Sequence, residues 1–196
     1  EYIRKACEIT DACYEHLKSF IKVGKTEKEI AFEIEMYFKT HGADGLAFAP
    51  IVAVGENSAN PHWIPSDRQV QQAEPILIDM GCKYKGYASD MTRMFFIGCI
   101  LEETKRVYDL VLKNQEKVIN EIKEYASIKT MAQMVESDWK LNHYTVMHAL
   151  GHGVGLETHE RPYITARNDT FLKENMVIAN EPGIYLPGRY GIRIED

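Results

Sequence analysis

The sequence predicts an α+β domain in which two helices followed by a strand hairpin occur twice along the chain. Amphipathic helical patterns cover residues 1–22 and 26–42 in the first half, and 102–123 and 128–140 in the second. Short apolar runs bounded by turn residues follow each helix pair, as expected for strands. This recurrence indicates an internal pseudo-two-fold symmetry, with strands of both halves in one sheet and the helices outside it.

The two helices of the first half are expected to pack through apolar faces. The first helix carries its apolar or small side chains along one side: Ile3, Ala6, Cys7, Thr10, Cys13, Tyr14, Leu17 and Ile21. Thr26 and Glu29 form a capping-box pattern that begins the second helix, and Gly42 ends it. A buried strand is expected near residues 47–54.

The first hairpin is predicted from PILIDMG, residues 75–81, and YASDMTRMFFI, residues 87–97. A fold between Tyr84 and Lys85 places Asp79 directly opposite Asp90, and opposed residues share a face with Cβ atoms about 4.5–5.5 Å apart. An Asp beside a turn is more often solvated or a capping residue. Here, however, both acids have apolar neighbours, where an unpaired charge is costly.

The second hairpin is predicted from VIANEPGIY, residues 177–185, and GIRIED, residues 191–196. A fold centred on Gly188 places Glu181 opposite Glu195, with Arg193 on the same face as Glu195. The four carboxylates of the two hairpins resist burial together, because like charges raise each other's pKa. Two divalent ions would balance four negative charges, so the spacing favours a dinuclear metal site.

A histidine-rich motif, MHALGHGVGLETHERP at residues 147–162, lies between the two hairpins and contains His148, His152 and His159. It is not a helical HExxH zinc motif, because Ala149 follows His148. Glycines at 151, 153 and 155 also disfavour a helix. Leu156 breaks the GxGxxG dinucleotide pattern. We interpret the motif as an irregular strand and loop that passes close to a site. A lone histidine is more often structural, but three within twelve residues favour function.

These motifs closely resemble the pita-bread metallopeptidases, and within them the Xaa-Pro aminopeptidase and Xaa-Pro dipeptidase (prolidase) branch. The resemblance rests on DMGCKYKGYASDMTRMFFIG, HALGHGVGLETHERP, NEPGIY and GIRIED, and it covers nearly the whole chain. It implies one catalytic domain over residues 1–196, with a curved, mostly antiparallel sheet and helices on its outer face. Methionine aminopeptidases share this fold but typically carry a different motif in place of RIED.

The resemblance also implies five metal ligands: Asp79, Asp90, His152, Glu181 and Glu195. Asp90 and Glu195 would bridge the two metals. Asp79 would bind one metal, and His152 and Glu181 the other. Three histidines would be catalytic and substrate contacts around the metals: His62, within ENSANPHWIPSDR, His148 and His159.

Arg193 has two interpretations. As a substrate-binding residue it would steer a peptide or its carboxylate by bidentate hydrogen bonds. The alternative is a structural ion pair with a ligand acid or with Asp196.

The implied activity is hydrolysis of the Xaa-Pro bond in peptides or dipeptides that have proline at the second position. Oxygen-rich ligation favours Mn²⁺, followed by Co²⁺ or Zn²⁺. Glu181 is expected to accept the water proton, and His159 to stabilise the developing oxyanion. Two alternatives stay open: a methionine aminopeptidase or creatinase-like hydrolase, and a non-catalytic pita-bread module that binds peptides.

Composition limits the remaining function classes. The 196 residues carry a net charge of −6 without a basic run, which argues against nucleic-acid and membrane partners. Four cysteines without CxxC spacing suggest reduced thiols in a cytoplasmic protein. The resemblance implies a homodimer in the full-length protein, and a family N-terminal domain and extreme C-terminal segment that are absent here. Glu195 lies one residue from the last residue, so we expect it in a fraying terminus.

Overall fold

The structure is a computed structural model that describes residues 1–196, and it contains the predicted repetition of two helices followed by strands. The first half comprises α1 (Tyr2–Phe20), α2 (Glu27–Thr40), β1 (Gly45–Leu46), β2 (Ile51–Val54), a short 3-10 helix η1 (Gly55–Ala59), β3 (Pro75–Met80), β4 (Cys82–Tyr84), β5 (Tyr87–Ala88) and β6 (Met91–Phe96). The second half comprises α3 (Glu102–Glu121), α4 (Ile128–Leu141), β7 (Gly151–Gly153), β8 (Glu160–Ile164), β9 (Ile178–Asn180), β10 (Gly183–Leu186) and β11 (Tyr190–Arg193).

The helix boundaries follow local chemistry. The capping box at α2 is confirmed, because the Thr26 hydroxyl accepts from the Glu29 amide and the Glu29 carboxylate accepts from the Thr26 amide. Along α1 the predicted face is largely buried, but Cys7 is exposed. Strand β2 begins at Ile51, later than predicted, because Pro50 cannot donate a ladder hydrogen bond.

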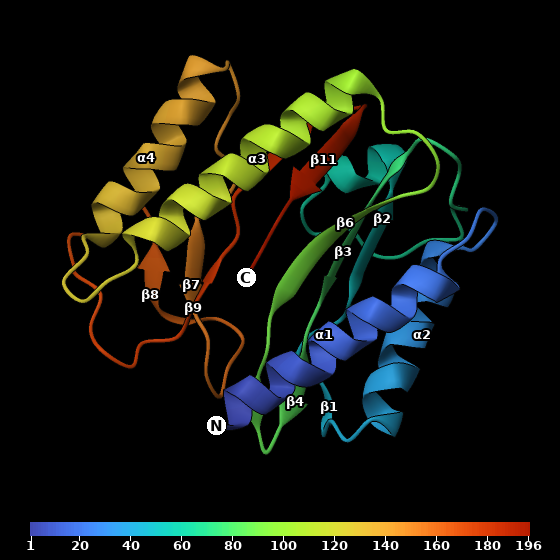
Figure 1. Ribbon diagram of the computed structural model, residues 1–196, viewed down its shortest axis with the longest axis horizontal. Coiled ribbons are helices and arrows are strands. Elements are labelled where there is room, and N and C mark those ends of the chain that lie inside the picture. The colour runs from blue at the N-terminus through green and yellow to red at the C-terminus, as the bar shows by residue number, and fades with distance from the viewer.

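All strand pairs are antiparallel, and hydrogen bonds define four small groups: β1-β4-β5, β2-β3-β6, β8-β7-β9 and β10-β11. The last residues of the chain connect the halves. The Glu195 amide donates to the Thr92 carbonyl at 3.1 Å, and Asn180 and Asp196 exchange backbone hydrogen bonds at 2.8 and 3.3 Å. Figure 1 shows the C-terminus between the strands of the first half and those of the second half.

Helices α1 and α2 cover the strands of the first half, and α3 and α4 lie over the strands of the second half (Figure 1). Successive side chains of β3 point alternately into two different hydrophobic cores. Ile76 and Ile78 belong to the core formed with α1 and α2, whereas Leu77 belongs to the core formed with α3 and α4. Asp79 shares the face of Leu77, so the strand directs this carboxylate away from the first helix pair.

The first hairpin is formed with a register that differs from the prediction. Asp79 pairs with Thr92 rather than with Asp90, because the turn is centred between Lys85 and Gly86. These two residues have φ values of +52° and +81°, as a two-residue type I′ turn requires. A shift of two residues preserves the face, so Asp90 still lies on the same side as Asp79.

The register of the second hairpin is confirmed. Gly183 pairs with Arg193, and the same alignment continues to Asn180 and Asp196, which places Glu181 level with Glu195. Glu195 is only 2% exposed, so the expectation of a fraying terminus was wrong. Its backbone bond to Thr92 and the burial of its side chain hold it in place.

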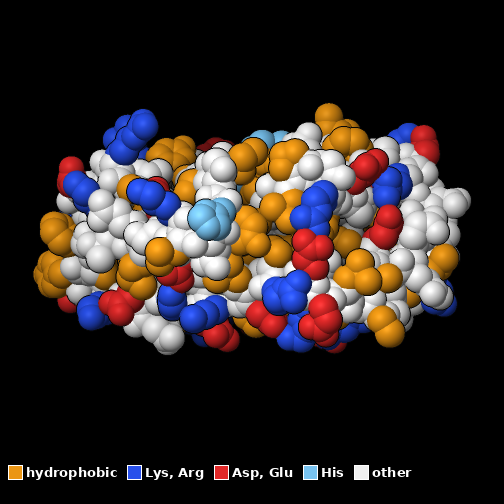
Figure 2. All heavy atoms as spheres, turned by 90° about the horizontal axis from the view of Figure 1, so that it is seen from above, with side chains coloured by type: hydrophobic (Ala, Val, Ile, Leu, Met, Phe, Trp, Pro, Cys, Tyr) orange, Lys and Arg blue, Asp and Glu red, His pale blue; other side chains and the backbone are white.

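Positive and negative side chains are interspersed on the face that Figure 2 displays, in keeping with a net charge of only −6 spread over 52 charged residues, 23 basic and 29 acidic. None of the helices combines the length and the apolar character that a membrane span requires.

Replacement of Gly81, at the junction of β3 and β4, is expected to destabilise the first hairpin. A Cβ at this position would overlap the backbone carbonyl oxygen of Ser89, which cannot move aside. We expect Gly81→Ala to lower the free energy of unfolding by about 3 kcal/mol. Urea denaturation of the metal-free protein measures this change.

The control is Gly98→Ala. Gly98 has a φ of +82° but open space around it, so this variant carries backbone strain alone, about 1–2 kcal/mol. If Gly81→Ala lowered the free energy of unfolding less than Gly98→Ala does, the backbones at Gly81 and Ser89 could move apart at little cost, contrary to this prediction.

Candidate metal centre

One cavity of about 350 Å³ collects every residue that the sequence singled out for chemistry. These residues are His62, Asp79, Asp90, His148, His152, His159, Glu181, Arg193 and Glu195. They come from both halves of the chain. The lining also includes Gly151, one of the glycines of the histidine motif. Five further lining residues were not indicated by the sequence: Phe48, Ile51, Pro61, Ala149 and Tyr163. The two hairpins and the histidine motif therefore meet at one place in the fold.

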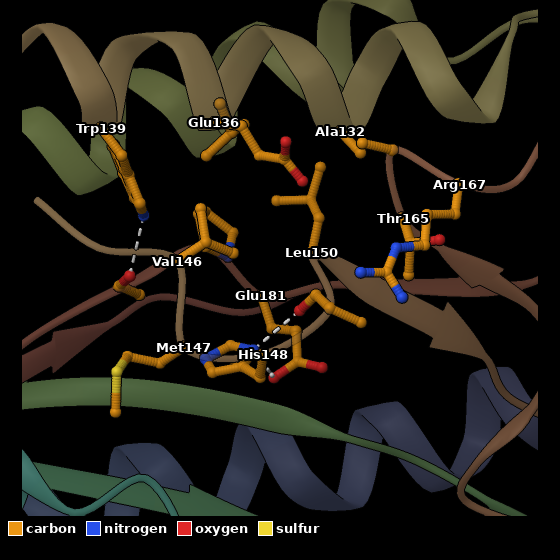
Figure 3. A pocket seen from close by; sticks show the side chains of 15 residues that line it. Ala132, Glu136, Trp139, Val146, Met147, His148, Leu150, Thr165, Arg167 and Glu181 are labelled. Atoms are coloured by element: carbon orange, nitrogen blue, oxygen red, sulfur yellow. Dashed lines mark hydrogen bonds and ion pairs between the residues drawn. The ribbon is translucent and has the colours of Figure 1, made fainter.

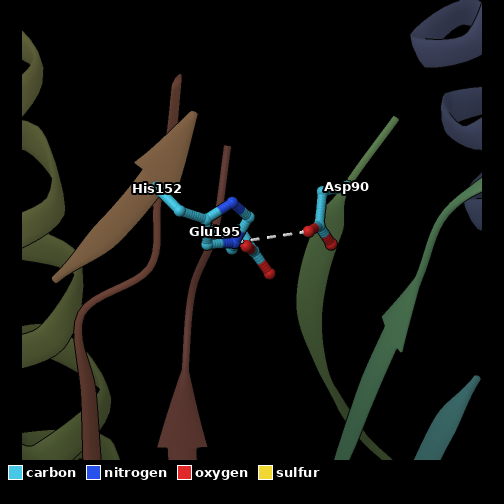
Figure 4. Close-up of side chains that lie close together, drawn as sticks. All are labelled: Asp90, His152 and Glu195. Carbon is cyan, nitrogen blue, oxygen red and sulfur yellow. Dashed lines mark ion pairs between the residues drawn. The ribbon is translucent and has the colours of Figure 1, made fainter. Parts of the chain in front are cut away.

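Asp90, His152 and Glu195 form the tightest group in the cavity. Each offers one ligand atom, and these atoms lie within 4.8 Å of one another (Figure 4). Asp90 comes directly before β6, His152 lies in β7, and Glu195 follows β11. His152 and Glu195 are 3% and 2% exposed, so bulk water does not screen the group. This is a candidate site for a divalent cation.

The orientation of the His152 ring fits a metal ligand. Its Nδ1 lies 3.0 Å from the Gly153 carbonyl oxygen, which can only accept, so Nδ1 carries the proton. Nε2 then presents a lone pair, and it lies 3.6 Å from both Asp90 Oδ2 and Glu181 Oε1. Burial lowers the pKa of His152, which favours the neutral ring. A lone pair facing two carboxylates is favourable when a cation lies between them.

The electrostatics of the carboxylates also fit a cation site. Burial, reinforced by the charges of Glu195, Asp79 and Glu181, raises the pKa of Asp90 well above its ordinary value. Burial and neighbouring carboxylates raise the pKa of Glu195 in the same way. Burial raises the pKa of Glu181 to about 7, although the Arg193 charge opposes this effect. Divalent ions would restore the ionised forms at neutral pH.

Arg193 is a buried cation that ties the two halves together. Its Nη2 donates to Asp79 Oδ2 at 2.6 Å, and its Nε donates to Thr92 Oγ1 at 3.0 Å. The structural ion pair that the sequence left open is therefore present, and it involves Asp79. Asp196 pairs instead with Arg93. The second oxygen of Asp79, Oδ1, is buried without a hydrogen-bond partner, which leaves it available to a cation.

Two residues of the centre were missed by the sequence analysis. The Thr92 hydroxyl donates to Glu195 Oε2 at 2.6 Å while it accepts from Arg193. The Tyr185 hydroxyl lies 2.8 Å from His148 Nε2 and accepts from Arg193 at 2.8 Å. The two-residue period of a strand was the signal that could have found them. Thr92 lies two positions after Asp90, and Tyr185 four after Glu181.

The three remaining histidines occupy different environments. His159 lies beside His152, with ring centroids 4.2 Å apart. His148 has both ring nitrogens engaged, Nδ1 by the Ala149 carbonyl at 2.7 Å and Nε2 by Tyr185. Burial lowers the pKa of His148 to about 4, so its ring is neutral at neutral pH. His62 is exposed on the loop after η1, and its side chain forms no hydrogen bond.

A second cavity of about 600 Å³ adjoins the metal centre and shares His148, Ala149 and Glu181 with it. Figure 3 shows it beneath α4, with Glu136 and Trp139 above His148 and Glu181. The Trp139 indole donates to the Gly183 carbonyl at 3.0 Å, which fixes α4 over this region. Although this cavity is larger, the candidate group of three ligand atoms from Asp90, His152 and Glu195 lies in the smaller one.

Comparisons with known proteins agree with this fold and site. Residues 1–196 match Metallopeptidase family M24, so the chain belongs to that family. It is 40% identical to an Xaa-Pro dipeptidase of Pyrococcus furiosus, over 100% of this chain and 57% of that protein. It is also 40% identical to an uncharacterized peptidase of Staphylococcus saprophyticus, with the same coverage. The chain thus spans somewhat more than half the length of these relatives.

Solved structures agree equally well. An X-Pro aminopeptidase from Thermotoga maritima has a TM-score of 0.96 and 41% identity, over 99% of this chain and 56% of that one. The prolidase from Pyrococcus furiosus has a TM-score of 0.96 and 40% identity, over 100% and 58%. The predicted pita-bread fold is therefore confirmed, as is the resemblance to the Xaa-Pro branch.

The raised carboxyl pKa values lead to a pH-dependence of stability. Glu181 has an ordinary pKa of 4.5 and a folded-state pKa of about 7 without metal, so the folded protein binds more protons in that interval. The stability of the metal-free protein is expected to fall as pH rises from about 5 to about 8, with Asp90 and Glu195 contributing in the same direction. Bound metal should reduce this fall, because it stabilises the ionised forms.

Thermal unfolding in a chelator, followed by calorimetry across this pH range, measures the effect. Glu181→Gln is the matched variant and should show a shallower decline. A metal-free melting temperature that rises steadily to pH 8 would contradict the proposed clustering of ionisable acids.

The Thr92 contacts lead to a prediction about metal affinity. In Thr92→Val the hydroxyl that orients Glu195 is lost, and loss of such a partner typically weakens metal binding about 10–100-fold. Chelator competition with Mn²⁺ measures the affinity. Thr104→Val makes the same change at a buried threonine in α3, outside the cavity lining, and should leave affinity unchanged. Equal metal affinities in both variants would mean that Glu195 does not depend on the hydrogen bond from the Thr92 hydroxyl to bind metal.

Proposed function

We propose that this chain is the catalytic domain of a metallo-exopeptidase that hydrolyses the Xaa-Pro bond at the N-terminus of peptides or in dipeptides. The observation that carries the proposal is the buried group of Asp90, His152 and Glu195, in which neutral Nε2 faces carboxylate oxygens. The names of the relatives support the substrate class, since an Xaa-Pro dipeptidase and an X-Pro aminopeptidase are among them.

We further propose two divalent ions, with Mn²⁺ as the first candidate and Co²⁺ or Zn²⁺ behind it. The bridging ligands would be Asp90 and Glu195, whose carboxylates both line the cavity and belong to its group of three close ligand atoms. Asp79 would bind one ion through Oδ1, while Arg193 retains Oδ2. His152 and Glu181 would bind the other ion, which agrees with their separation of 3.6 Å.

When bound, the metal ions supply a water nucleophile near neutral pH and polarise the scissile carbonyl. Glu181 would accept the proton of the attacking water and pass it toward the leaving proline nitrogen. Its folded-state pKa of about 7 in the absence of metal shows how strongly its environment disfavours an isolated charge. His159, beside His152, donates a hydrogen bond to the developing oxyanion.

His62 and His148 are proposed as further catalytic and substrate contacts at the cavity wall. The Tyr185 hydroxyl engages His148 Nε2, so a substrate must replace or extend that contact. Arg193 is proposed to act mainly on Asp79, because the ion pair occupies its Nη2, and its role in steering a substrate carboxylate stays a prediction. The homodimer and the cytoplasmic location also stay predictions.

Substrate profiling tests the proposal. With Mn²⁺ present, Xaa-Pro dipeptides and longer Xaa-Pro peptides should be cleaved, whereas Met-Xaa peptides and creatine should be much poorer substrates. Preference for Met-Xaa peptides would support a methionine aminopeptidase instead. Specific peptide binding without any hydrolysis or metal uptake would support the non-catalytic module.

Two variants separate the metal-binding role from the catalytic role. Asp90→Asn removes a proposed bridging charge and is expected to abolish both metal binding and hydrolysis. His159→Ala is expected to retain the metals but to reduce turnover about 10²–10³-fold, as loss of an oxyanion donor does. Metal content by mass spectrometry and single-substrate kinetics provide the two measurements. Equal metal loss in both variants would show that the roles are assigned wrongly.

A further inference from the structure

Glu27, the first residue of α2, is fully buried and lies outside the metal-cavity lining. No basic side chain pairs with it, and its environment instead contains five hydrogen-bond donors. Such a set of donors is unusual for a carboxylate whose only task is to begin a helix, because Thr26 and Glu29 already cap α2.

The donors come from one continuous stretch of chain between residues 54 and 66. Glu27 Oε1 accepts from the Val54 amide at 2.7 Å and from Asn57 Nδ2 at 2.9 Å. Glu27 Oε2 accepts from Trp63 Nε1 at 2.9 Å, and from the Ser66 amide and hydroxyl at 2.8 and 2.6 Å. One carboxylate therefore gathers the start, the middle and the end of this segment, which we call the 54–66 loop.

The opposite side of the 54–66 loop rests on the strand that leads to the metal centre. The Gly191 amide in β11 donates to Ser58 Oγ at 2.8 Å, and Arg193 Nη1 donates to the Pro61 carbonyl at 3.3 Å. A Cβ at Gly191 would overlap the Ser58 carbonyl oxygen, so the two backbones are in direct contact. The loop is thus held between α2 on one side and β11 on the other.

His62 lies within this loop and lines the metal cavity. Its side chain forms no hydrogen bond, and its only tether is a bond from its backbone amide to Asn60 Oδ1 at 3.0 Å. The location of the ring therefore depends on the path of the loop backbone. Glu27 holds that backbone on both sides of His62, at Val54 before it and at Ser66 after it.

We propose that Glu27 is a positioning residue, which fixes the 54–66 loop so that His62 is placed at the wall of the metal cavity for substrate contact. The inference rests on the proposed Xaa-Pro hydrolysis, because it assigns Glu27 a role in that reaction through His62. Glu27 touches neither the metal ligands nor the space for substrate. Its effect on catalysis passes through the loop.

The carboxylate is specifically suited to this task. Five donors converge on its two oxygens, which together offer about four lone-pair sites and no hydrogen, so two of the three donors on Oε2 share a site. In Glu27→Gln one oxygen becomes an NH₂ group, which would face donors with no acceptor to satisfy it. Glu27→Asp would retain the charge, but the new side chain is one methylene shorter and would not reach both ends of the loop.

The test is a double-mutant cycle on kcat/KM in the metal-loaded, full-length protein, using Glu27→Gln and His62→Ala. Glu27→Gln alone is expected to reduce kcat/KM for Xaa-Pro peptides about 10–100-fold, since misplaced contacts are costly. Metal content should stay unchanged. In the His62→Ala background the same change should cost about 2-fold or less, because the contact it positions is already absent.

Glu29→Gln is the matched control, since it makes the same chemical change in the same helical turn but contacts only Thr26 and Lys25. It should leave kcat/KM unchanged. Equal losses from Glu27→Gln in both backgrounds would overturn the proposal, because they would show an effect that does not pass through His62. If Glu27→Gln fails to fold, Ser66→Ala removes a single donor and serves in the same cycle.

A spectroscopic readout separates this proposal from the proposed function. The Trp63 indole proton, assigned by its loss in Trp63→Phe, should move upfield and exchange faster in Glu27→Gln, because its charge-assisted hydrogen bond is weakened. An unchanged Trp63 signal would overturn the positioning role. Absence of Xaa-Pro hydrolysis in the unmodified protein would contradict the proposed function, while the Trp63 signal would still report whether Glu27 holds the loop.

Discussion

The mutual repulsion of buried carboxylates is the constraint around which this domain is organised. Asp79, Asp90, Glu181 and Glu195 reach one cavity from two hairpins far apart in sequence, and a single guanidinium, that of Arg193, offsets only part of their charge. Burial and like charge raise the pKa of Asp90 and of Glu195, so the protein without cations holds this group at a cost. Cations bound at this site would relieve the repulsion between the carboxylates, and that relief would contribute to the affinity for metal. The same side chains therefore determine both the geometry and the charge of the site.

The surrounding structure supports that centre through a small number of buried polar contacts. Thr92 connects Glu195 to Arg193, and Arg193 in turn holds Asp79, so acids of both hairpins are joined by one chain of hydrogen bonds. Thr92 also accepts the backbone bond from Glu195 that joins the halves of the sheet. Thr92 and Glu195 therefore contribute both to the connection between the two halves of the domain and to the orientation of the proposed ligands. Glu27 performs a comparable task from outside the cavity lining, because it organises the loop that carries His62 rather than a ligand.

Prediction from the sequence succeeded where a feature depends on neighbouring residues. The capping box of α2, the helices and the register around Gly188 follow from local chemistry: Pro187 and Gly188 suit a turn whose third position has φ of +72°. The first hairpin shows the limit of such reasoning. CKYKG permits more than one turn centre, and the left-handed conformation of Lys85, which is unusual for that residue type, moved the partner of Asp79 by two positions. The face survived the shift because strands alternate with a period of two.

The sequence by itself determined which side chains are candidates for the chemistry, since acids within apolar strands and a glycine-flanked histidine can be recognised without coordinates. The cavity that gathers all nine predicted residues was also foreseeable from the two hairpins and the resemblance to a known family. Only the tertiary structure decided which partner each group has: Arg193 with Asp79, Thr92 with Glu195, and Glu27 with the 54–66 loop. Such pairs join residues from 27 to 114 positions apart. Their choice depends on how whole elements pack, and no local pattern along the chain encodes that packing.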